Sequence, residues 1–224
     1  MTRKCSDFYT AHVDWLPTNI KGLKGIPTFK DSTWNGLDAL TGNLNFPYNW
    51  IISNISGNGQ FSESNAKKTI EILKSKPQAE LIVEIGTSCG SCFKGGSTDI
   101  ISKNKNADAY FYSIDIVAHN PGIDRQKYKN IEFVQSKSVD QKIKGILENR
   151  LIDVLFIDGD HSLQVVFEEY QFYLPLMKKD GIILVHDTTL HPGPFLLMEA
   201  VNENTFKKEV FFEEDYGLGV IYLQ

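Results

Sequence analysis

Five short apolar runs recur between residues 81 and 185, and they constrain the fold more than any other feature of the sequence. Each run is rich in β-branched or aromatic residues, and most are almost continuously apolar, which is typical of strands buried on both faces of a sheet. Helical segments separate several of the runs, and this alternation favours a parallel sheet with helices on both faces. The runs are residues 81–85, 110–114, 131–134, 154–157 and 182–185, and the helical segments are residues 97–103, 141–148 and 162–177.

The C-terminal end departs from this alternation. After a predicted helix near residues 195–203, two further runs at 209–212 and 219–223 are joined by a short turn around Asp215, Tyr216 and Gly217. Strands joined by so short a connection have to be antiparallel. The sequence therefore predicts an α/β fold in which a doubly wound, mostly parallel sheet ends in an antiparallel hairpin.

The first 61 residues differ from the rest, because they are rich in Gly, Asn, Pro and Trp and lack strong periodicity. We interpret residues 1–61 as an irregular N-terminal arm that packs on the core domain, residues 62–224, in a position to cover a site. Trp15, Trp34 and Trp50 are expected to anchor this arm. The first helix of the core domain is predicted to start near Ser62 or Ser64 and to end at Pro77.

Charge and composition exclude several classes of partner. The formal net charge of -5 argues against nucleic acid, because phosphate binding needs clustered Lys and Arg. The first residues contain no apolar stretch typical of a secretion signal, and no apolar run approaches the about 20 residues that span a membrane. Three cysteines are too few for a disulfide framework and favour a reducing compartment. We therefore expect a cytoplasmic protein without nucleic acid or membrane partners, and a homo-oligomer is compatible with the sequence.

Ligands of doubly wound sheets lie beyond the C-terminal ends of the strands, so the residues that end each run are candidate site residues. The first run ends in Glu84, and Gly86, Thr87 and Ser88 follow it in a loop where glycine allows a tight turn and a close approach to a ligand. The second run ends at Asp115, whose carboxylate can accept hydrogen bonds from the ribose of a nucleoside-like ligand. Either feature alone is also compatible with an ordinary turn or helix cap.

The fourth and fifth runs end in a cluster of titratable residues. Asp158 and His161 follow the fourth run, and His186 and Asp187 end the fifth. Neighbouring strands lie about 5 Å apart, so these side chains are expected to converge. Two carboxylates and an imidazole at one place indicate a divalent cation with oxygen ligands and a general base.

These strand ends resemble those of the class I S-adenosylmethionine-dependent methyltransferases. More narrowly, they resemble the small-molecule and sugar O-methyltransferase branch, which includes the macrocin-type and cephalosporin-hydroxylase-like proteins. The resemblance covers about residues 62–224 and rests on segments 84–87, 156–161 and 185–187 together with Asp115. It implies a Rossmann-like methyltransferase fold, S-adenosylmethionine as cofactor, and methylation of a hydroxyl on a sugar or other small molecule. In its metal-dependent members it also implies Mg²⁺.

The resemblance also implies roles for individual residues. Asp158 and Asp187 match the metal-binding carboxylates, His161 matches the base, and His161 and Asp158 form the catalytic pair. His186 stands where some metal-dependent members carry Glu, and residues 91–94 lengthen the first loop. The residues that match cofactor contacts are Glu84, Gly86, Thr87, Ser88, Asp115, Ser138 (near the adenine) and Asp158.

Three other interpretations remain open at the level of sequence. Cys89 and Cys92 form a C-x-x-C pair, as in redox proteins, although five helix-linked strands and a hairpin exceed a thioredoxin domain. An NAD-dependent oxidoreductase would also use Asp115, but Gly86 and Gly90 lack the G-x-G-x-x-G spacing. A non-catalytic cofactor-binding subunit is the third alternative. Beyond these, His191 follows the fifth run closely enough to line a substrate pocket.

Overall fold

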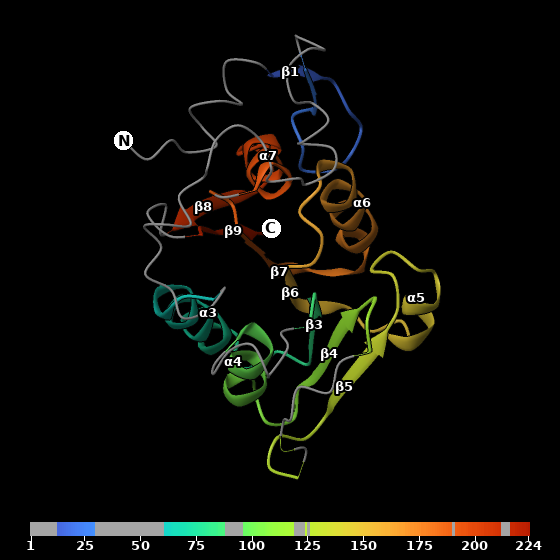
Figure 1. Ribbon diagram of the computed structural model, residues 1–224, viewed down its shortest axis with the longest axis vertical. Helices are drawn as coiled ribbons and strands as arrows, with labels where there is room; N and C mark the ends of the chain where they lie inside the picture. Colours follow the sequence, from blue (N-terminus) through green and yellow to red (C-terminus); the bar gives the residue numbers. More distant parts are fainter. Residues whose placement is uncertain are drawn as a thin grey trace.

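The fold is organised around a seven-stranded sheet with the strand order β5-β4-β3-β6-β7-β9-β8. It was obtained as a computed structural model, which describes residues 13–29, 61–87, 96–118, 124, 126–189, 191–211 and 216–224. Figure 1 shows the sheet at the centre of the molecule with helices on either side. The strands of this sheet are β3 (Leu81–Ile85), β4 (Tyr110–Asp115), β5 (Ile131–Gln135), β6 (Ile152–Ile157), β7 (Met177–His186), β8 (Lys207–Phe211) and β9 (Leu218–Tyr222).

The five apolar runs form the parallel part of the sheet. Every residue of β3 and β6 is buried, as their almost continuously apolar sequences predict, and these two strands lie side by side in parallel register. β4, β5 and β7 extend the parallel pairing on either side. β9 pairs antiparallel with β7, and β8 pairs antiparallel with β9. The predicted fold class, including the C-terminal hairpin, is therefore confirmed.

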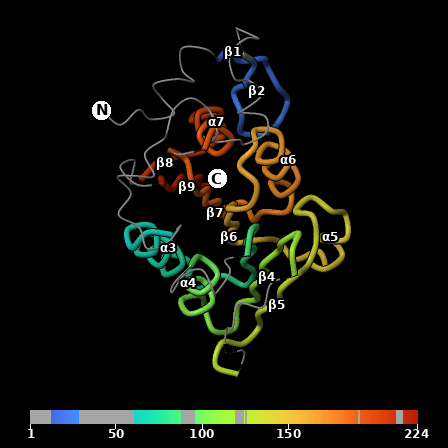
Figure 2. The backbone as a smooth tube through the Cα atoms, viewed as in Figure 1, coloured from blue at the N-terminus to red at the C-terminus, as the bar shows by residue number. Residues whose placement is uncertain are grey.

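Helices cover both faces of the sheet (Figure 2). Successive strand residues point into different cores. Ile82, Phe156 and Leu184 pack toward α3 and α4, whereas Leu155 and Ile183 pack toward the helices of the opposite face. The first face carries α3 (Glu63–Ser75) and α4 (Ser97–Asn104), and the opposite face carries α5 (Lys142–Ile146), α6 (Leu163–Tyr173) and α7 (Pro192–Ala200).

Helix ends differ from the sequence prediction where proline is present. α6 ends at Tyr173, and a short 3₁₀ turn, Leu174–Leu176, leads into β7, because Pro175 cannot continue the hydrogen bonding of an α-helix. β7 consequently starts at Met177, earlier than the predicted run. α7 begins at Pro192, since proline is well suited to the first turn of a helix. Of the two predicted starts of α3, the structure has the one at Ser62, which is the N-cap and whose hydroxyl accepts from the Asn65 N–H.

Within the N-terminal region the structure describes residues 13–29, which form a two-stranded antiparallel sheet of β1 (Val13–Leu16) and β2 (Ile26–Phe29). The connection between these strands contacts α6 and α7: the Lys24 N–H donates to the Ala200 carbonyl at 2.8 Å, and the Tyr170 hydroxyl donates to the Lys21 carbonyl at 3.1 Å. Trp15 packs, partly buried, against the core. Trp34 and Trp50 lie outside the described residues, and the division at residue 61 stays a prediction.

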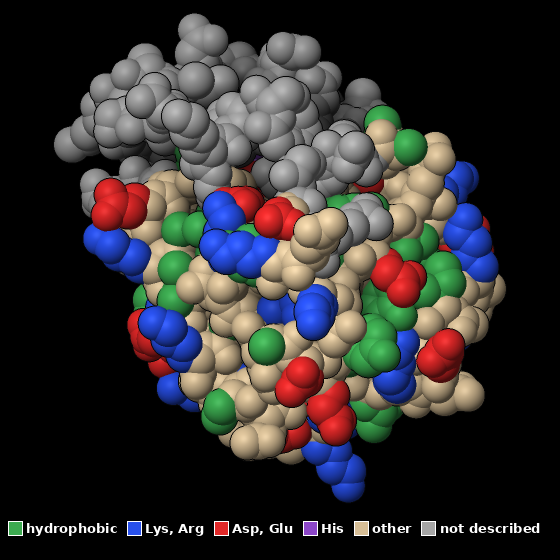
Figure 3. All heavy atoms as spheres, turned by 90° about the horizontal axis from the view of Figure 1, so that it is seen from below, with side chains coloured by type: hydrophobic (Ala, Val, Ile, Leu, Met, Phe, Trp, Pro, Cys, Tyr) green, Lys and Arg blue, Asp and Glu red, His purple; other side chains and the backbone are tan. Residues whose placement is uncertain are grey.

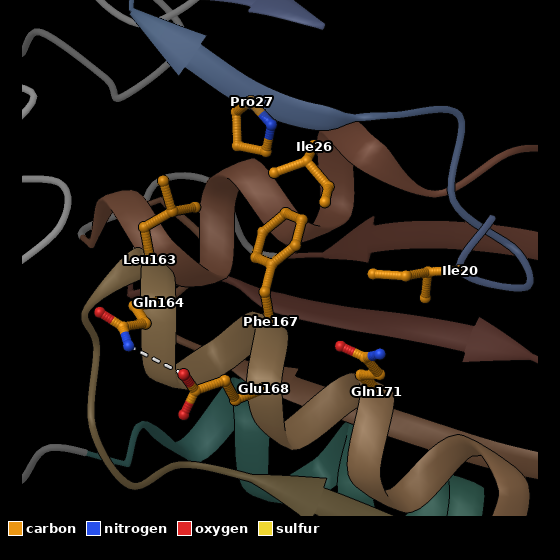
Figure 4. Close-up of a pocket in the computed structure, with 8 residues that line it drawn as sticks. All are labelled: Ile20, Ile26, Pro27, Leu163, Gln164, Phe167, Glu168 and Gln171. Atoms are coloured by element: carbon orange, nitrogen blue, oxygen red, sulfur yellow. Dashed lines mark hydrogen bonds between the residues drawn. The ribbon is translucent and has the colours of Figure 1, made fainter. Parts of the chain in front are cut away.

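A shallow apolar cavity of about 250 Å³ separates this hairpin from α6 (Figure 4). Ile26 and Pro27 face Leu163 and Phe167 across it. Among the described residues, no helix is both long and apolar enough to cross a membrane. On the face shown in Figure 3, basic and acidic side chains of the described residues are interspersed rather than gathered by sign.

Candidate functional site

The strand order reverses between β3 and β6, and we call the region beyond the carboxyl ends of these two strands the crevice. From β3 the chain proceeds outward through β4 and β5, and it then returns to β6 on the other side of β3. Gly86 follows β3 with φ at 88°, a left-handed conformation that favours glycine. A Cβ at this position would overlap the Asp158 carbonyl, and the Asp158 N–H donates to the Ile85 carbonyl at 2.9 Å. The two loops therefore touch at the position where doubly wound folds bind ligands.

Glu84 lies fully buried beneath the first loop. Its Oε2 accepts hydrogen bonds from the Ser113 hydroxyl at 2.6 Å and the Thr98 hydroxyl at 2.7 Å. Its Oε1 has no hydrogen-bond partner among the described residues. Burial raises the pKa of Glu84 to about 7, although the bonds from Ser113 and Thr98 oppose this rise. A buried acid with one unpartnered oxygen beside the crevice is compatible with the predicted cofactor role.

Asp115 ties the end of β4 to the first loop. Its Oδ2 accepts from the Thr87 N–H at 2.9 Å, and its Oδ1 accepts from the Val117 N–H at 2.8 Å. The Thr87 hydroxyl lies 2.8 Å from the Ser113 hydroxyl. Asp115 is therefore oriented by backbone N–H groups at the strand end where a ribose acid was predicted. Ser88, Cys89 and Cys92 lie outside the described residues.

Ser138 follows β5 and is held against α6, because the Tyr173 hydroxyl donates to its carbonyl at 2.6 Å. Near it lies Glu169 of α6, a buried carboxyl whose Oε2 has no partner among the described residues. Burial raises the pKa of Glu169 to about 8. The sequence prediction missed Glu169, and the signal that could have found it is an acid on the apolar face of a helix.

The titratable cluster predicted at the ends of β6 and β7 is assembled in the structure. His161 Nε2 lies 2.8 Å from Asp187 Oδ2 and 3.9 Å from Asp158 Oδ1. His186 Nδ1 lies 3.0 Å from Asp158 Oδ1 and 3.4 Å from Asp187 Oδ1. Asp187 adopts φ of 60°, which is uncommon outside glycine and marks a constrained backbone at the strand end. The two carboxylates and two imidazoles therefore converge on one small volume.

His186 is the most enclosed member of this cluster. It is buried, and its Nε2 lies 3.0 Å from the Asn65 side-chain nitrogen of α3. With a neutral ring whose Nε2 accepts from the Asn65 amide, the Nδ1–H donates to Asp158; a protonated ring donates from both nitrogens and requires the Asn65 side-chain oxygen at Nε2. Asn65 was not predicted from the sequence, since a single Asn on a helix gives no sign of a contact 121 residues away.

Burial and the charges of neighbouring side chains shift the pKa values of the cluster in opposite directions. Burial alone would lower the pKa of His161, but the neighbouring carboxylates Asp158 and Asp187 raise it to about 10. The same competition raises the pKa of His186 well above its usual value. Burial opposes ionisation of Asp187, yet the two imidazoles hold the pKa of this carboxyl far below its ordinary range. The cluster thus favours positive charge beside its carboxylates.

Several buried atoms of the cluster face one another without a well-directed hydrogen bond. Although His161 Nε2 is 2.8 Å from Asp187 Oδ2, its N–H does not point at that oxygen, so the contact is mainly an ion pair. Asp187 Oδ1 likewise has no hydrogen-bond partner among the described residues. The cluster contains two sets of potential metal ligands, and within each set the ligand atoms lie within 4.8 Å of one another. One set is His161, Asp187 and His191, and the other is Asp158, His186 and Asp187.

Comparison with known proteins places this site in a methyltransferase context. Residues 83–188, just under half of the chain, match the family described as methyltransferase domain. Over 132 residues the chain is 31% identical to the uncharacterized protein R132 of Acanthamoeba polyphaga mimivirus. This alignment covers 54% of this chain and 57% of that protein.

Two solved structures share the fold. One is the MycE methyltransferase of mycinamycin biosynthesis, in complex with Mg, SAH and mycinamycin VI, at a TM-score of 0.52 and 14% identity, covering 70% of this chain and 48% of that one. The other is a candidate O-methyltransferase from Klebsiella pneumoniae, at a TM-score of 0.54 and 16% identity, covering 73% and 81%. The chain spans about half the length of MycE and of R132.

The matched residues run from β3 through the end of β7, so they include the crevice, Asp115 and most of the titratable cluster. Residues 83–188 therefore match a methyltransferase domain, and the chain shares the fold of the solved MycE methyltransferase.

Proposed function

We propose that the protein transfers the methyl group of S-adenosylmethionine to a hydroxyl of a sugar or other small molecule. The observation that carries this proposal is the pairing of His161 with Asp187 beside the crevice of a methyltransferase domain. The solved MycE structure, which contains SAH and a small-molecule ligand on the same fold, supports a small-molecule acceptor.

The cofactor would lie across the β3 and β4 ends of the crevice. Asp115, oriented by the Thr87 and Val117 N–H groups, would accept hydrogen bonds from the ribose hydroxyls. The turn at Gly86, with Thr87 and Ser88, would receive the methionine part, and Oε1 of Glu84, which has no partner among the described residues, would accept from its ammonium group. Ser138 at the end of β5 would contact the adenine edge, and Asp158 would face both cofactor and acceptor.

The acceptor hydroxyl needs a proton acceptor, because a neutral hydroxyl is a weak nucleophile. In the proposed reaction its oxygen forms a bond to the methyl carbon, the carbon–sulfur bond breaks, and the electron pair remains on sulfur as a thioether. The hydroxyl proton passes to His161, and Asp187 stabilises the resulting imidazolium at 2.8 Å. His161 must be unprotonated before this step. The sulfonium charge of the cofactor, and any cation that neutralises Asp158 and Asp187, would lower its pKa.

The residues that would hold a cation are Asp158 and Asp187, as predicted, with His186 between them. Asp158 Oδ1, His186 Nδ1 and Asp187 Oδ1 lie within 4.8 Å of one another, and Asp187 Oδ1 has no hydrogen-bond partner among the described residues. To bind a cation, His186 would release its Nδ1 proton and give up its hydrogen bond to Asp158. The nitrogen donor makes this set better suited to an ion such as Mn²⁺ than to the all-oxygen coordination that Mg²⁺ prefers. When bound, such an ion would polarise the acceptor hydroxyl.

Turnover and binding assays test the proposal. The purified protein should release S-adenosylhomocysteine from S-adenosylmethionine when offered a panel of sugars, phenols and natural-product alcohols, and His161→Ala should reduce the rate by about 10²–10⁴-fold. Lys74→Ala, at an exposed position of α3, is the control and should leave the rate unchanged. Calorimetry should show binding of S-adenosylhomocysteine. Tighter binding of NAD, or full activity of a stable His161→Ala protein, would contradict the proposal.

A further inference from the structure

His191 lies directly against the ring of His161. The two imidazoles are stacked, with ring centroids 3.9 Å apart and planes inclined by 11°. Building on the proposed function, we infer that His191 is a positioning residue, which fixes the ring plane of His161 for proton transfer through this stack. From the sequence, His191 is expected only to line the substrate pocket.

Backbone hydrogen bonds fix His191 relative to the predicted base, His161, and to its ion-pair partner, Asp187. The His191 N–H donates to the Asp187 carbonyl at 3.0 Å, and the Gly193 N–H donates to the His161 carbonyl at 3.2 Å. A Cβ on Gly193 would overlap that carbonyl, so glycine is what allows the start of α7 to approach His161 so closely. His191 is also the N-cap residue of α7, which ties its position to a nine-residue helix.

The stack supplies an orientation that the ion pair alone does not. Rotation about the bond to a histidine ring is broad, so a contact at one ring nitrogen leaves the ring plane weakly defined. The only short contact of His161 with Asp187 is at Nε2, and its N–H is not aimed at the oxygen. A parallel ring at van der Waals distance removes the remaining freedom, because tilting His161 would bring it into His191.

Exposure separates the roles of the two rings. The side chain of His161 keeps 26% of its surface exposed, whereas that of His191 keeps 10%. The less buried ring can reach an acceptor, while the more buried ring supports it from behind. His191 Nε2 lies 3.9 Å from Asp187 Oδ2, so it sits near the same carboxylate without taking the contact that His161 uses.

Three substitutions separate stacking from mere filling of space. His191→Phe retains a flat ring without nitrogen, His191→Leu retains apolar volume without a flat ring, and His191→Ala removes both. The measurement that needs no acceptor is the histidine side-chain ¹H–¹⁵N NMR spectrum, in which the His161 signals are assigned by their loss in His161→Gln. We expect one narrow set of His161 signals in the parent and in His191→Phe, and broadened or split signals in His191→Leu and His191→Ala.

Kinetics supply the second measurement, because a misplaced base affects catalysis rather than cofactor binding. With an active acceptor, His191→Leu should lower kcat by about 10- to 100-fold, while the Kd for S-adenosylhomocysteine stays unchanged and His191→Phe retains most of the rate. The inference is overturned if His191→Leu keeps the parent His161 signals and kcat. It is equally overturned if His191→Phe is as impaired as His191→Leu. Failure of the proposed function would appear separately, as absence of turnover with every acceptor in the parent protein.

Discussion

The buried carboxyl of Glu84 gives a quantitative test of the electrostatics at the crevice. Its substitution Glu84→Gln replaces an acid by a neutral amide of nearly the same shape. The amide oxygen can accept the bonds from Ser113 and Thr98, which Glu84 Oε2 accepts at 2.6 and 2.7 Å. The amide nitrogen takes the place of Oε1, which has no partner among the described residues. The variant therefore resembles the protonated parent and cannot ionise.

The sign and size of the effect follow from the pKa of Glu84, which burial raises from 4.5 to about 7. Between these pH values the folded protein holds a proton that the unfolded chain has released, so stability falls as pH rises through this range. At about 1.4 kcal/mol per pH unit, the parent should lose about 3 kcal/mol by pH 8 through this group alone. The variant should therefore match the parent near pH 4.5 and exceed its stability by about 3 kcal/mol at pH 8.

Urea unfolding of both proteins from pH 4.5 to 8 measures this difference, since the other titrating groups are common to both and cancel in the comparison. In a thermal scan at pH 8 the same difference corresponds to a melting temperature higher by roughly 6–12 °C in the variant. Parallel pH profiles for the two proteins would refute the reasoning, because they would mean that Glu84 has the same pKa in the folded and unfolded states. Measurements without ligand are needed, because a bound ammonium group would itself stabilise the ionised carboxylate.

Other changes probe the turn, the ribose acid and the cation. Gly86→Ala should abolish soluble folding or strongly lower the melting temperature, because alanine would have to adopt a positive φ and its Cβ would overlap the Asp158 carbonyl. The control Gly145→Ala, whose Cβ would lie in open space on α5, should leave the melting temperature unchanged or slightly higher. Asp115→Ala should weaken S-adenosylhomocysteine binding by about 1–3 kcal/mol in calorimetry, because the ribose and the Thr87 N–H lose their acceptor. Asp187→Asn should abolish any stimulation of turnover by Mn²⁺ in chelator-treated protein, while unaltered stimulation would exclude Asp187 as a ligand.

The sheet could be predicted from the sequence because each strand is indicated by the apolar character of its own residues. Most of the five runs carry their own signal, almost continuous apolar character, and the structure buries every residue of β3 and β6 as that signal predicts. The cluster at the strand ends follows from the same locality. Once β6 and β7 are parallel neighbours, the residues that follow them have to meet, and His161 lies 2.8 Å from Asp187 for this reason.

The contacts that the sequence did not predict depend on how separate elements pack. Asn65 meets His186 only because α3 lies across the end of β7, and Glu169 lies near Ser138 only because α6 covers that edge of the sheet. Neither residue belongs to a motif, so periodicity and spacing give no reason to connect them.

His191 is the instructive intermediate case. Its closeness to Asp187 is local, since the two are four residues apart and joined by a backbone hydrogen bond. Its stacking on His161 is not local, because it requires α7 to start against the loop that follows β6, at a distance that only Gly193 permits. Glycine has a low helix propensity, so propensity does not explain why Gly193 directly follows His-Pro at the start of α7. Its presence there is explained by close approach, and this explanation makes Gly193→Ala a second way to disturb the His161 ring without altering either imidazole.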